Sequence, residues 1–338
     1  MRVRTIYWSE SNGGSINLLD QTKLPSQIEE LTIDNHSDLV AAIKRLSVRG
    51  APALGVAGAL GVALILLRAE SEKWDAVQIS KAISELRDAR PTAVNLAWGV
   101  DQVTPLAKSG AAAVLKRALE LAAEDAKACR AMGRIGTDYL VEKLGNRKLR
   151  ILTHCNTGAL ATTEWGTALG VVQELHGRGL IEEVFADETR PLLQGSRLTA
   201  WELSQAKIPY RILPDGAAAS ALFSGLIDAV LIGADRIAKN GDSANKIGSL
   251  AVAVAAHEAK VPFLVVAPES TVDRKLATGA EIEIEFRGDD EVTNFAGVRT
   301  APLGALTYNP AFDVTPARYI AAVVTEKEVY EVSKGVSL

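Results

Sequence analysis

Short apolar segments alternate with helical stretches throughout the second half of the chain, and this alternation constrains the fold more than any other feature. The apolar segments cover residues 150–153, 183–186, 210–213, 229–232 and 263–267. Each is followed by a polar or glycine-bearing turn and then by a helical pattern of roughly 10–15 residues. This rhythm predicts an α/β fold with a Rossmann-like, doubly wound parallel sheet.

The first half of the chain has a different pattern. The first thirty or so residues combine β-branched and aromatic side chains with an Asn-Gly-Gly turn at 12–14, which predicts a small β-hairpin. From residue 37 to 144 the apolar periodicity is helical, and a polar turn at 145–148 ends it. We therefore predict two domains, a hairpin plus helical domain over 1–145 and a Rossmann-like domain over 146–338.

One apolar run raises the question of a membrane span. Residues 51–67 contain no charged side chain, which brings the run to the lower length limit of a spanning helix. Glycines at Gly55, Gly58 and Gly61 instead favour a helix packed closely inside a protein core. The amino terminus lacks a basic segment followed by an apolar one. We therefore expect a cytoplasmic protein that has no membrane partner.

The net charge and the number of cysteines argue against two further classes of protein, those that bind nucleic acid and those held together by disulfides. The chain has 37 Lys and Arg residues and 41 Asp and Glu residues, a formal net charge of −4. Proteins that neutralise nucleic-acid phosphates carry a clustered basic excess instead. Two cysteines, Cys129 and Cys155, are too few for disulfide bonds to stabilise a fold of this length. We expect neither a nucleic-acid partner nor a disulfide framework.

Candidate chemistry lies beyond the carboxyl ends of the predicted strands, where open parallel sheets bind ligands. Cys155 follows the first predicted strand. A cysteine is most often a small buried hydrophobe, but the Asn-Thr-Gly after it and an expected helix offer amides that activate a thiol or bind an anion. His154 is interpreted as structural, because successive strand residues point to opposite faces.

Asp235 follows the fourth predicted strand, 229–232. Burial at the end of an apolar strand raises the pKa of a carboxyl toward the range useful for general acid–base catalysis. A helix cap or an ion pair with Arg236 is the alternative role. Asp235 and Cys155 are the two catalytic candidates.

Cationic positions suggest an anionic ligand. Arg49 and Gly50 stand immediately before a predicted helix, where backbone amides favour an anion. Arg90 offers a second cation, and Asn245 with Lys246 a third position near a helix start. Each is more often a solvated side chain, but together they favour a phosphorylated small molecule.

Metal and nucleotide sites have little support. The histidines are dispersed and the two cysteines lack ligand spacing, so no metal is expected. The glycines of 55–61 do not have the spacing of a dinucleotide-binding loop, and there is no Gly-Lys-Ser/Thr phosphate loop. We therefore expect neither a nicotinamide-dependent nor an ATP-dependent enzyme.

Several long motifs resemble one family, the methylthioribose-1-phosphate isomerases of the initiation-factor 2B alpha/beta/delta-like superfamily. They occur in the family's order over nearly the whole chain. The motifs are Arg49-Gly50-Ala51-Pro52-Ala53-Leu54-Gly55, Arg90-Pro91-Thr92-Ala93-Val94-Asn95-Leu96, Asn156-Thr157-Gly158, Gln194-Gly195-Ser196-Arg197, Gly233-Ala234-Asp235-Arg236, Asn240-Gly241-Asp242 and 309–316.

The resemblance implies a cofactor-free aldose–ketose isomerase of methionine salvage that forms a homodimer. Such an enzyme converts 5-methylthioribose 1-phosphate to 5-methylthioribulose 1-phosphate. The implied catalytic residues are Cys155 and Asp235. The implied substrate-binding residues are Arg49, Gly50, Ala51, Arg90, Gln194, Asn245 and Lys246.

The chain departs from the family in places, and other functions stay open. Glu164-Trp165 and Ser196 differ from the residues usual in the family, which affects the surroundings of the sugar. A related isomerase acting on 5-deoxyribose 1-phosphate or ribose 1,5-bisphosphate is one alternative. A non-catalytic regulatory subunit of a guanine-nucleotide exchange factor is another, and a generic α/β binding protein is a third.

Overall fold

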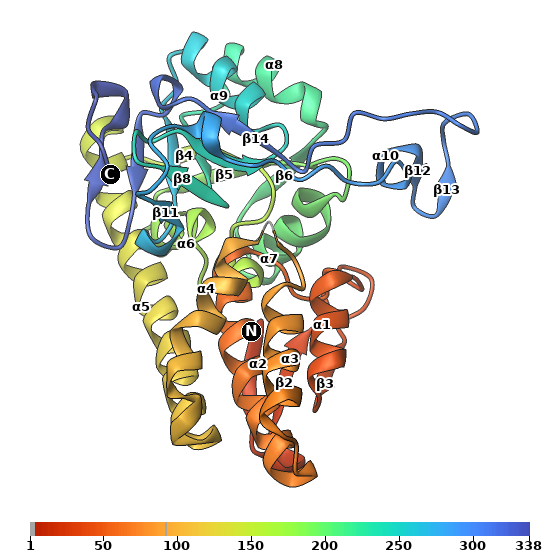
Figure 1. Ribbon diagram of the computed structural model, residues 1–338. Coiled ribbons are helices and arrows are strands. Elements are labelled where there is room, and N and C mark those ends of the chain that lie inside the picture. Colours follow the sequence, from red (N-terminus) through yellow and green to blue (C-terminus); the bar gives the residue numbers. More distant parts are fainter. Residues whose placement is uncertain (1–3, 92) are drawn as a thin grey trace. The chain divides into compact units, whose positions relative to one another are not determined.

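The computed structural model describes residues 4–91 and 93–338 and contains two compact units (Figure 1). The helical unit comprises Met1–Arg130 with Thr157–Gly166, and the sheet unit comprises Ala131–Asn156 with Thr167–Leu338. Their division falls inside the long helix α5 (Ala111–Leu144), so the predicted boundary after residue 145 stays a prediction. Val3 of the predicted hairpin and Thr92 of the motif after Arg90 lie outside the described residues.

The predicted hairpin is present in the helical unit. Strand β1 (Ile6–Ser9) pairs antiparallel with β2 (Ser15–Leu19), which pairs with β3 (Glu30–Ile33) on its other side. Ile16 and Leu18 alternate with Asn17 along β2, and the two apolar side chains are fully buried. This period of two gives the small sheet one face that packs on the core of the unit.

Two helices of this unit, those that start at His36 and Ala76, begin after side-chain capping residues. The Asn35 side chain accepts a hydrogen bond from the Asp38 amide, and Asp75 forms a reciprocal capping box with Gln78. In the described part of this unit, the α-helices that precede α5 are α1 (His36–Lys44), α2 (Ala51–Glu72), α3 (Ala76–Arg87) and α4 (Val94–Val103).

Helix α2 is the core helix that its glycines predict. A Cβ atom at Gly99 of α4 would lie 1.9 Å from the carbonyl oxygen of Gly55 in α2, so the two backbones touch where side chains are absent. By length and composition α2 is able to cross a membrane, but 78% of its apolar window is buried inside the structure. Burial among neighbouring helices accounts for its apolar sequence.

The sheet unit is built on a largely parallel sheet. Its strand order is β16-β15-β10-β7-β4-β5-β6, with only the edge strand β16 antiparallel among the strands described. The predicted strands β6 (Tyr210–Leu213) and β7 (Ala229–Ile232) have the bounds expected from sequence. The other members are β4 (Leu149–Thr153), β5 (Ile181–Asp187), β10 (Phe263–Val266), β15 (Ala322–Val324) and β16 (Val329–Tyr330).

A second, smaller sheet carries part of the predicted site. It has the order β11-β8-β9-β14, made of β11 (Val272–Asp273), β8 (Arg236–Ala238), β9 (Ser243–Lys246) and β14 (Phe312–Thr315). The helices of the unit beyond α5 are α6 (Ala168–Gly177), α7 (Ala200–Gln205), α8 (Ala218–Phe223), α9 (Ser249–Glu258) and the short α10 (Asp290–Thr293).

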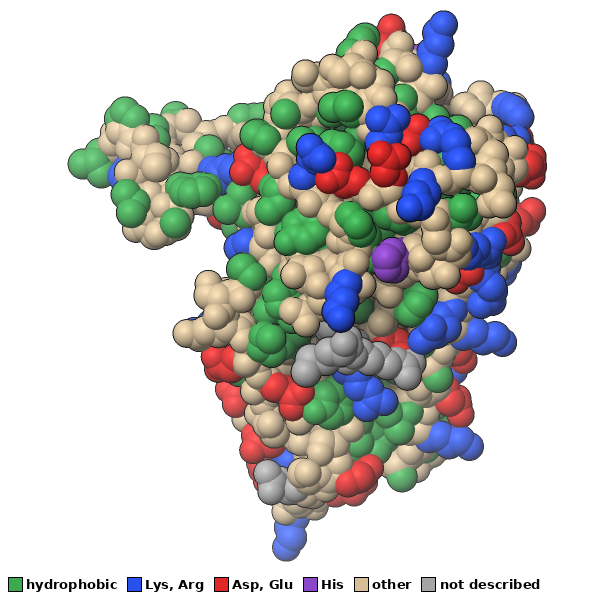
Figure 2. Space-filling view, turned by 180° about the vertical axis from the view of Figure 1, so that it is seen from behind, with side chains coloured by type: hydrophobic (Ala, Val, Ile, Leu, Met, Phe, Trp, Pro, Cys, Tyr) green, Lys and Arg blue, Asp and Glu red, His purple; other side chains and the backbone are tan. Residues whose placement is uncertain are grey.

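Residues 286–308, here called the arm, extend away from the body of the sheet unit (Figure 1). The arm contains α10 and a two-stranded ribbon of β12 (Asn294–Phe295) and β13 (Val298–Arg299). Apolar side chains gather on its surface (Figure 2). The most exposed are Leu306 at 90% and Leu303 at 89%.

Candidate active site

The two predicted catalytic residues follow neighbouring strands. Strands β4 and β7 are parallel and adjacent, and Thr153 of β4 pairs with Leu231 of β7. Cys155 lies two residues beyond Thr153, and Asp235 lies three residues beyond the end of β7. Because parallel strands end at the same edge of a sheet, both residues belong to the edge where such sheets bind ligands.

Cys155 is a buried thiol with an unusual backbone. Its side chain is 6% exposed and its φ is +65°, in the left-handed region that non-glycine residues rarely adopt. The Cys155 amide donates a hydrogen bond to Thr189 Oγ1 over 2.8 Å, and the Cys155 carbonyl oxygen accepts one from Thr199 Oγ1 over 2.6 Å. The backbone on both sides of the thiol is therefore held by side chains.

The helix expected directly after Gly158 is wrong. A single 3-10 turn covers Ala159–Ala161, and α6 begins only at Ala168. The intervening segment bonds to the helical unit instead, where Gln21 Nε2 donates to the Leu160 carbonyl and the Thr5 amide donates to the Thr163 carbonyl. These partners satisfy the backbone groups that a helix would have paired internally.

Asp235 lies on the turn between β7 and β8 and is half-buried. Its amide donates to the Ala244 carbonyl over 2.9 Å. Strand β8 rather than a helix follows it, and Arg236 pairs with Asp273 over 2.7 Å. The helix cap, one of the two alternative roles for this carboxylate, is thus wrong, and Arg236 has Asp273 as an ion-pair partner.

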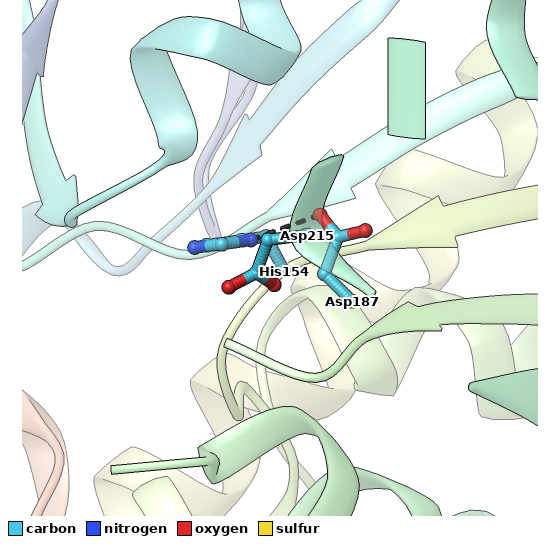
Figure 3. Close-up of side chains that lie close together, drawn as sticks. All are labelled: His154, Asp187 and Asp215. Carbon is cyan, nitrogen blue, oxygen red and sulfur yellow. Dashed lines mark hydrogen bonds and ion pairs between the residues drawn. The ribbon is translucent and has the colours of Figure 1, made fainter. Parts of the chain in front are cut away.

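The imidazole of His154 lies close to the carboxylates of Asp187 and Asp215 (Figure 3). Its Nδ1 lies 2.9 Å from Asp187 Oδ2 and its Nε2 lies 2.8 Å from the Ile247 carbonyl oxygen. Because a carbonyl only accepts, Nε2 donates to Ile247, and a proton is shared between Nδ1 and the carboxyl of Asp187. Both ring nitrogens are occupied, which supports the structural role predicted for His154.

The protonation of this pair follows from its surroundings. Burial disfavours a charged imidazole, but the hydrogen bond and charge of Asp187 and the Ile247 carbonyl outweigh it and raise the pKa of His154. Burial also raises the pKa of Asp187 against the opposing effect of His154. The pair therefore retains its shared proton to a higher pH than an isolated histidine.

Asp215 completes the cluster. Ligand atoms of His154, Asp187 and Asp215 all lie within 4.8 Å of one another, a spacing that metal sites share. The two oxygens of Asp215 accept hydrogen bonds from the amides of Thr189 and Arg190, each over 2.7 Å. The Asp215 oxygens and the ring nitrogens already have protein partners, whereas Asp187 Oδ1 is buried without a hydrogen-bond partner among the described residues.

Gln194 has the features of a ligand-facing residue. It is 4% exposed, and its Oε1 has no hydrogen-bond partner among the residues described. A buried acceptor of this kind costs free energy unless something donates to it. Gly195, which follows, starts a π-helical turn (Gly195–Thr199), and a Cβ there would lie 1.6 Å from the Asp187 carbonyl oxygen. Only glycine fits this position, which fixes where Gln194 stands.

Asn245 and Lys246 end strand β9, but they do not face a vacant helix start. Asn245 Nδ2 donates to Ser249 Oγ, and Lys246 Nζ donates to the Ala311 carbonyl over 2.7 Å. The amides of Gly248, the residue before α9, and of Leu250 in its first turn donate to the carboxylate of Asp313. The amino terminus of α9 is therefore occupied by a protein carboxylate, and any phosphate held here depends on the side chains of Asn245 and Lys246.

The remaining predicted residues belong to the helical unit. Arg49, Gly50 and Ala51 stand at the start of α2, and Arg90 follows α3. Gly50 has a φ of +91°, and a Cβ there would lie 2.5 Å from the backbone of Ala161. This close approach explains the glycine within the helical unit. Their role in substrate binding stays a prediction.

Thr189 and Thr199 were not among the sequence candidates, although their hydroxyl groups bond to Cys155. A lone threonine in a loop has no spacing or composition that sets it apart. Asp187 and Asp215 follow predicted strands in the sequence, but only the structure connects them with His154 and Thr189.

Comparisons with known proteins place the chain among relatives of two kinds. A model of the initiation factor 2 subunit family matches residues 47–331. A methylthioribose-1-phosphate isomerase from Thermosynechococcus vestitus is 45% identical over 97% of this chain and 94% of its own. A 5-deoxyribose 1-phosphate isomerase from Moorella thermoacetica is 44% identical over 97% of this chain and 94% of its own.

One relative is much longer than this chain. A probable bifunctional methylthioribose-1-phosphate isomerase/methylthioribulose-1-phosphate dehydratase from Nocardia farcinica is 50% identical over 94% of this chain. The match spans 57% of that relative's length.

Solved structures give the same two kinds of match. 5-Methylthioribose 1-phosphate isomerase from Pyrococcus horikoshii has a TM-score of 0.87 and 38% identity, covering 97% of this chain and 92% of its own. A structure described as translation initiation factor eIF-2B, subunit delta, from A. fulgidus has a TM-score of 0.83 and 39% identity, covering 97% of this chain and 96% of its own.

Proposed function

The chain belongs to the initiation factor 2 subunit family, and within it we propose that the protein is a sugar-phosphate aldose–ketose isomerase. The reaction converts 5-methylthioribose 1-phosphate to 5-methylthioribulose 1-phosphate in methionine salvage. The observation that carries this proposal is the 45% identity to an isomerase of that name over nearly the full length of both chains. The setting is the cytoplasm, with neither nucleic acid nor membrane as partner.

The chemistry of the substrate defines what the site must supply. The phosphate on C1 blocks spontaneous ring opening, so the enzyme must protonate the ring oxygen as the C1–O bond breaks. One hydrogen then moves from C2 to C1, and the C2 hydroxyl loses its proton to become the ketone. Asp235 acts as the acid on the ring oxygen, and Cys155 serves the transfer between C1 and C2.

Substrate binding falls to the residues that the family resemblance assigns. In the sheet unit these are Gln194, whose buried Oε1 suits a donating sugar hydroxyl, and Asn245 with Lys246, which suit the phosphate. In the helical unit they are Arg49, Gly50, Ala51 and Arg90.

We expect the purified protein, without added cofactor, to convert 5-methylthioribose 1-phosphate to the ketose, as followed by phosphorus and proton NMR. Parallel reactions with 5-deoxyribose 1-phosphate and ribose 1,5-bisphosphate set the specificity. The Moorella relative makes the first of these two the second candidate substrate. Running the reaction in D₂O also distinguishes the two routes by which hydrogen can move from C2 to C1. Deuterium at C1 identifies proton transfer, and full retention of the substrate hydrogen supports direct transfer.

Two outcomes of this NMR assay would contradict the proposed reaction or its substrate. A protein that binds one of the three phosphates but converts none of them contradicts the isomerase and supports a regulatory subunit. Conversion of 5-deoxyribose 1-phosphate at a far higher kcat/KM than the methylthio sugar would instead reassign the substrate and keep the reaction type.

The protein acts as a homodimer in this proposal, and the exposed arm supports it. A monomer rarely exposes so many large apolar side chains on one projecting segment. We expect the pair of changes Leu303→Asp and Leu306→Asp to shift the mass measured by light scattering from dimer to monomer. Val77→Asp is the matched control, because Val77 is 76% exposed on α3. A wild-type monomer, or a dimer unaffected by the arm changes, contradicts this role.

A further inference from the structure

Two left-handed residues meet at the proposed catalytic thiol. Cys155 has a φ of +65° and Thr189 a φ of +63°, and neither is a glycine. A positive φ at a β-branched residue such as threonine is a genuine outlier. Such conformations persist only where surrounding contacts determine them, and they concentrate at functional sites. The contacts that hold Cys155 and Thr189 in this conformation therefore bear on how the site works.

The two peptide groups of Cys155 are bonded to threonine hydroxyls from different segments. Thr189 Oγ1 accepts from the Cys155 amide over 2.8 Å and donates to the Asp187 carbonyl over 3.0 Å. Thr199 Oγ1 donates to the Cys155 carbonyl over 2.6 Å and accepts from Asn156 Nδ2 over 3.3 Å. Each hydroxyl thus uses its proton and a lone pair, which fixes its orientation.

Thr189 is itself fixed by a carboxylate. The carboxylate of Asp215 accepts hydrogen bonds from the amides of Thr189 and Arg190, each over 2.7 Å. These two bonds hold the left-handed turn after β5. Thr189 and Thr199 are fully buried, so water does not compete for their hydroxyls. The resulting chain of bonds runs from Asp215 through Thr189 to the backbone of Cys155.

We propose that Thr189 and Thr199 are positioning residues that aim the thiol of Cys155 by clamping its backbone in the left-handed conformation. The inference rests on the proposed catalytic role of Cys155. A left-handed residue turns its Cα–Cβ bond away from the direction that a continuing strand would give it. The hydroxyls act on the peptide groups, so they set the direction of the sulfur without touching the substrate.

The test compares isosteric and conservative changes at both threonines. Thr189→Val and Thr199→Val each remove a hydroxyl at nearly constant volume, and Thr189→Ser and Thr199→Ser retain it. Thr315→Val is the matched control, because Thr315 is fully buried and its Oγ1 has no hydrogen-bond partner in the described part of the chain. Thr199→Val is decisive on its own if valine at the strained position 189 prevents folding.

Two measurements, the steady-state constants and the rate of thiol modification, separate a positioning role of the threonines from a general loss of stability. We expect each valine variant to lower kcat about tenfold with KM within about twofold, and each serine variant to restore kcat, since misplacement of a reacting group costs rate rather than binding. In a Cys129→Ser background, we expect iodoacetamide to modify Cys155 at least about threefold faster in the valine variants, because thiol reactivity follows exposure and surroundings.

The outcomes distinguish this inference from the function on which it rests. Wild-type rates of Cys155 modification in both valine variants overturn the clamp, even if turnover falls. Faster modification with unchanged kcat in an active enzyme overturns its part in catalysis. If the wild-type protein converts no sugar phosphate, the proposed function fails, and the modification rates alone decide whether the threonines hold the thiol.

Discussion

Replacing Cys155 by serine or Asp235 by asparagine is expected to lower kcat at least about a hundredfold, the low end for removing a positioned acid or base. Serine keeps the size of cysteine but not its thiol chemistry, and asparagine keeps the shape of aspartate but cannot donate a carboxylic proton. Because both groups act on reacting atoms, the product should bind the variants within a few-fold of wild type. Steady-state NMR assays and product titrations measure the two quantities.

The matched control is Cys129→Ser, the same substitution at the other cysteine. Cys129 is fully buried in the helical unit, and its thiol donates to Asp125, a role that a serine hydroxyl is able to take over. Near-normal turnover in both Cys155→Ser and Asp235→Asn would show that neither residue is catalytic. A comparable loss in Cys129→Ser would show that the assay reports damage to folding rather than to the site.

Strands were the best-predicted part of the fold, for a physical reason. The runs at β6 and β7 are short and bounded by proline, glycine or aspartate, so their ends coincide with those of the structure. The ends of β4 and β7 also located Cys155 and Asp235, because polar residues after parallel strands gather at one edge. The position of a candidate residue along a parallel sheet is therefore readable from sequence.

Contacts between distant segments were not readable in the same way. The segment after Gly158 has the composition of a helix start, but Thr5 and Gln21 bond to it and hold it as a loop. Thr189 and Thr199 stand 34 and 44 residues from Cys155, and no periodicity connects them. Local patterns determine strands and helices, whereas hydrogen bonds between loops depend on the completed fold.

His154→Leu is expected to lower the free energy of unfolding by about 3–5 kcal/mol, the usual cost of removing one partner of a buried pair. The change leaves the carboxyl of Asp187, which is fully buried, without its partner and leaves the Ile247 carbonyl without its donor. The control His176→Leu, at an exposed histidine on α6, should change stability by less than about 0.5 kcal/mol. Urea unfolding followed by circular dichroism measures all variants.

The double change His154→Leu with Asp187→Leu tests whether the cost comes from the pair. Replacing both members of a buried pair by apolar side chains is often nearly neutral, so the double variant should be more stable than His154→Leu alone. A double variant whose loss equals the sum of the two single losses would contradict coupling between the residues. It also serves as the reference for pH dependence, because it lacks both titrating groups.

The direction in which the free energy of unfolding changes with pH follows from the pKa values of the pair. The pKa values of His154 and Asp187 are both raised on folding, so the native state binds more protons than the unfolded chain. Their contribution is complete below the ordinary pKa values and is lost as the pH rises through the folded ones. Above about pH 6.5, the ordinary pKa of histidine, wild type should therefore lose stability relative to the double variant. A difference that stays constant or grows between pH 6 and 9 would show that the pair does not hold its proton.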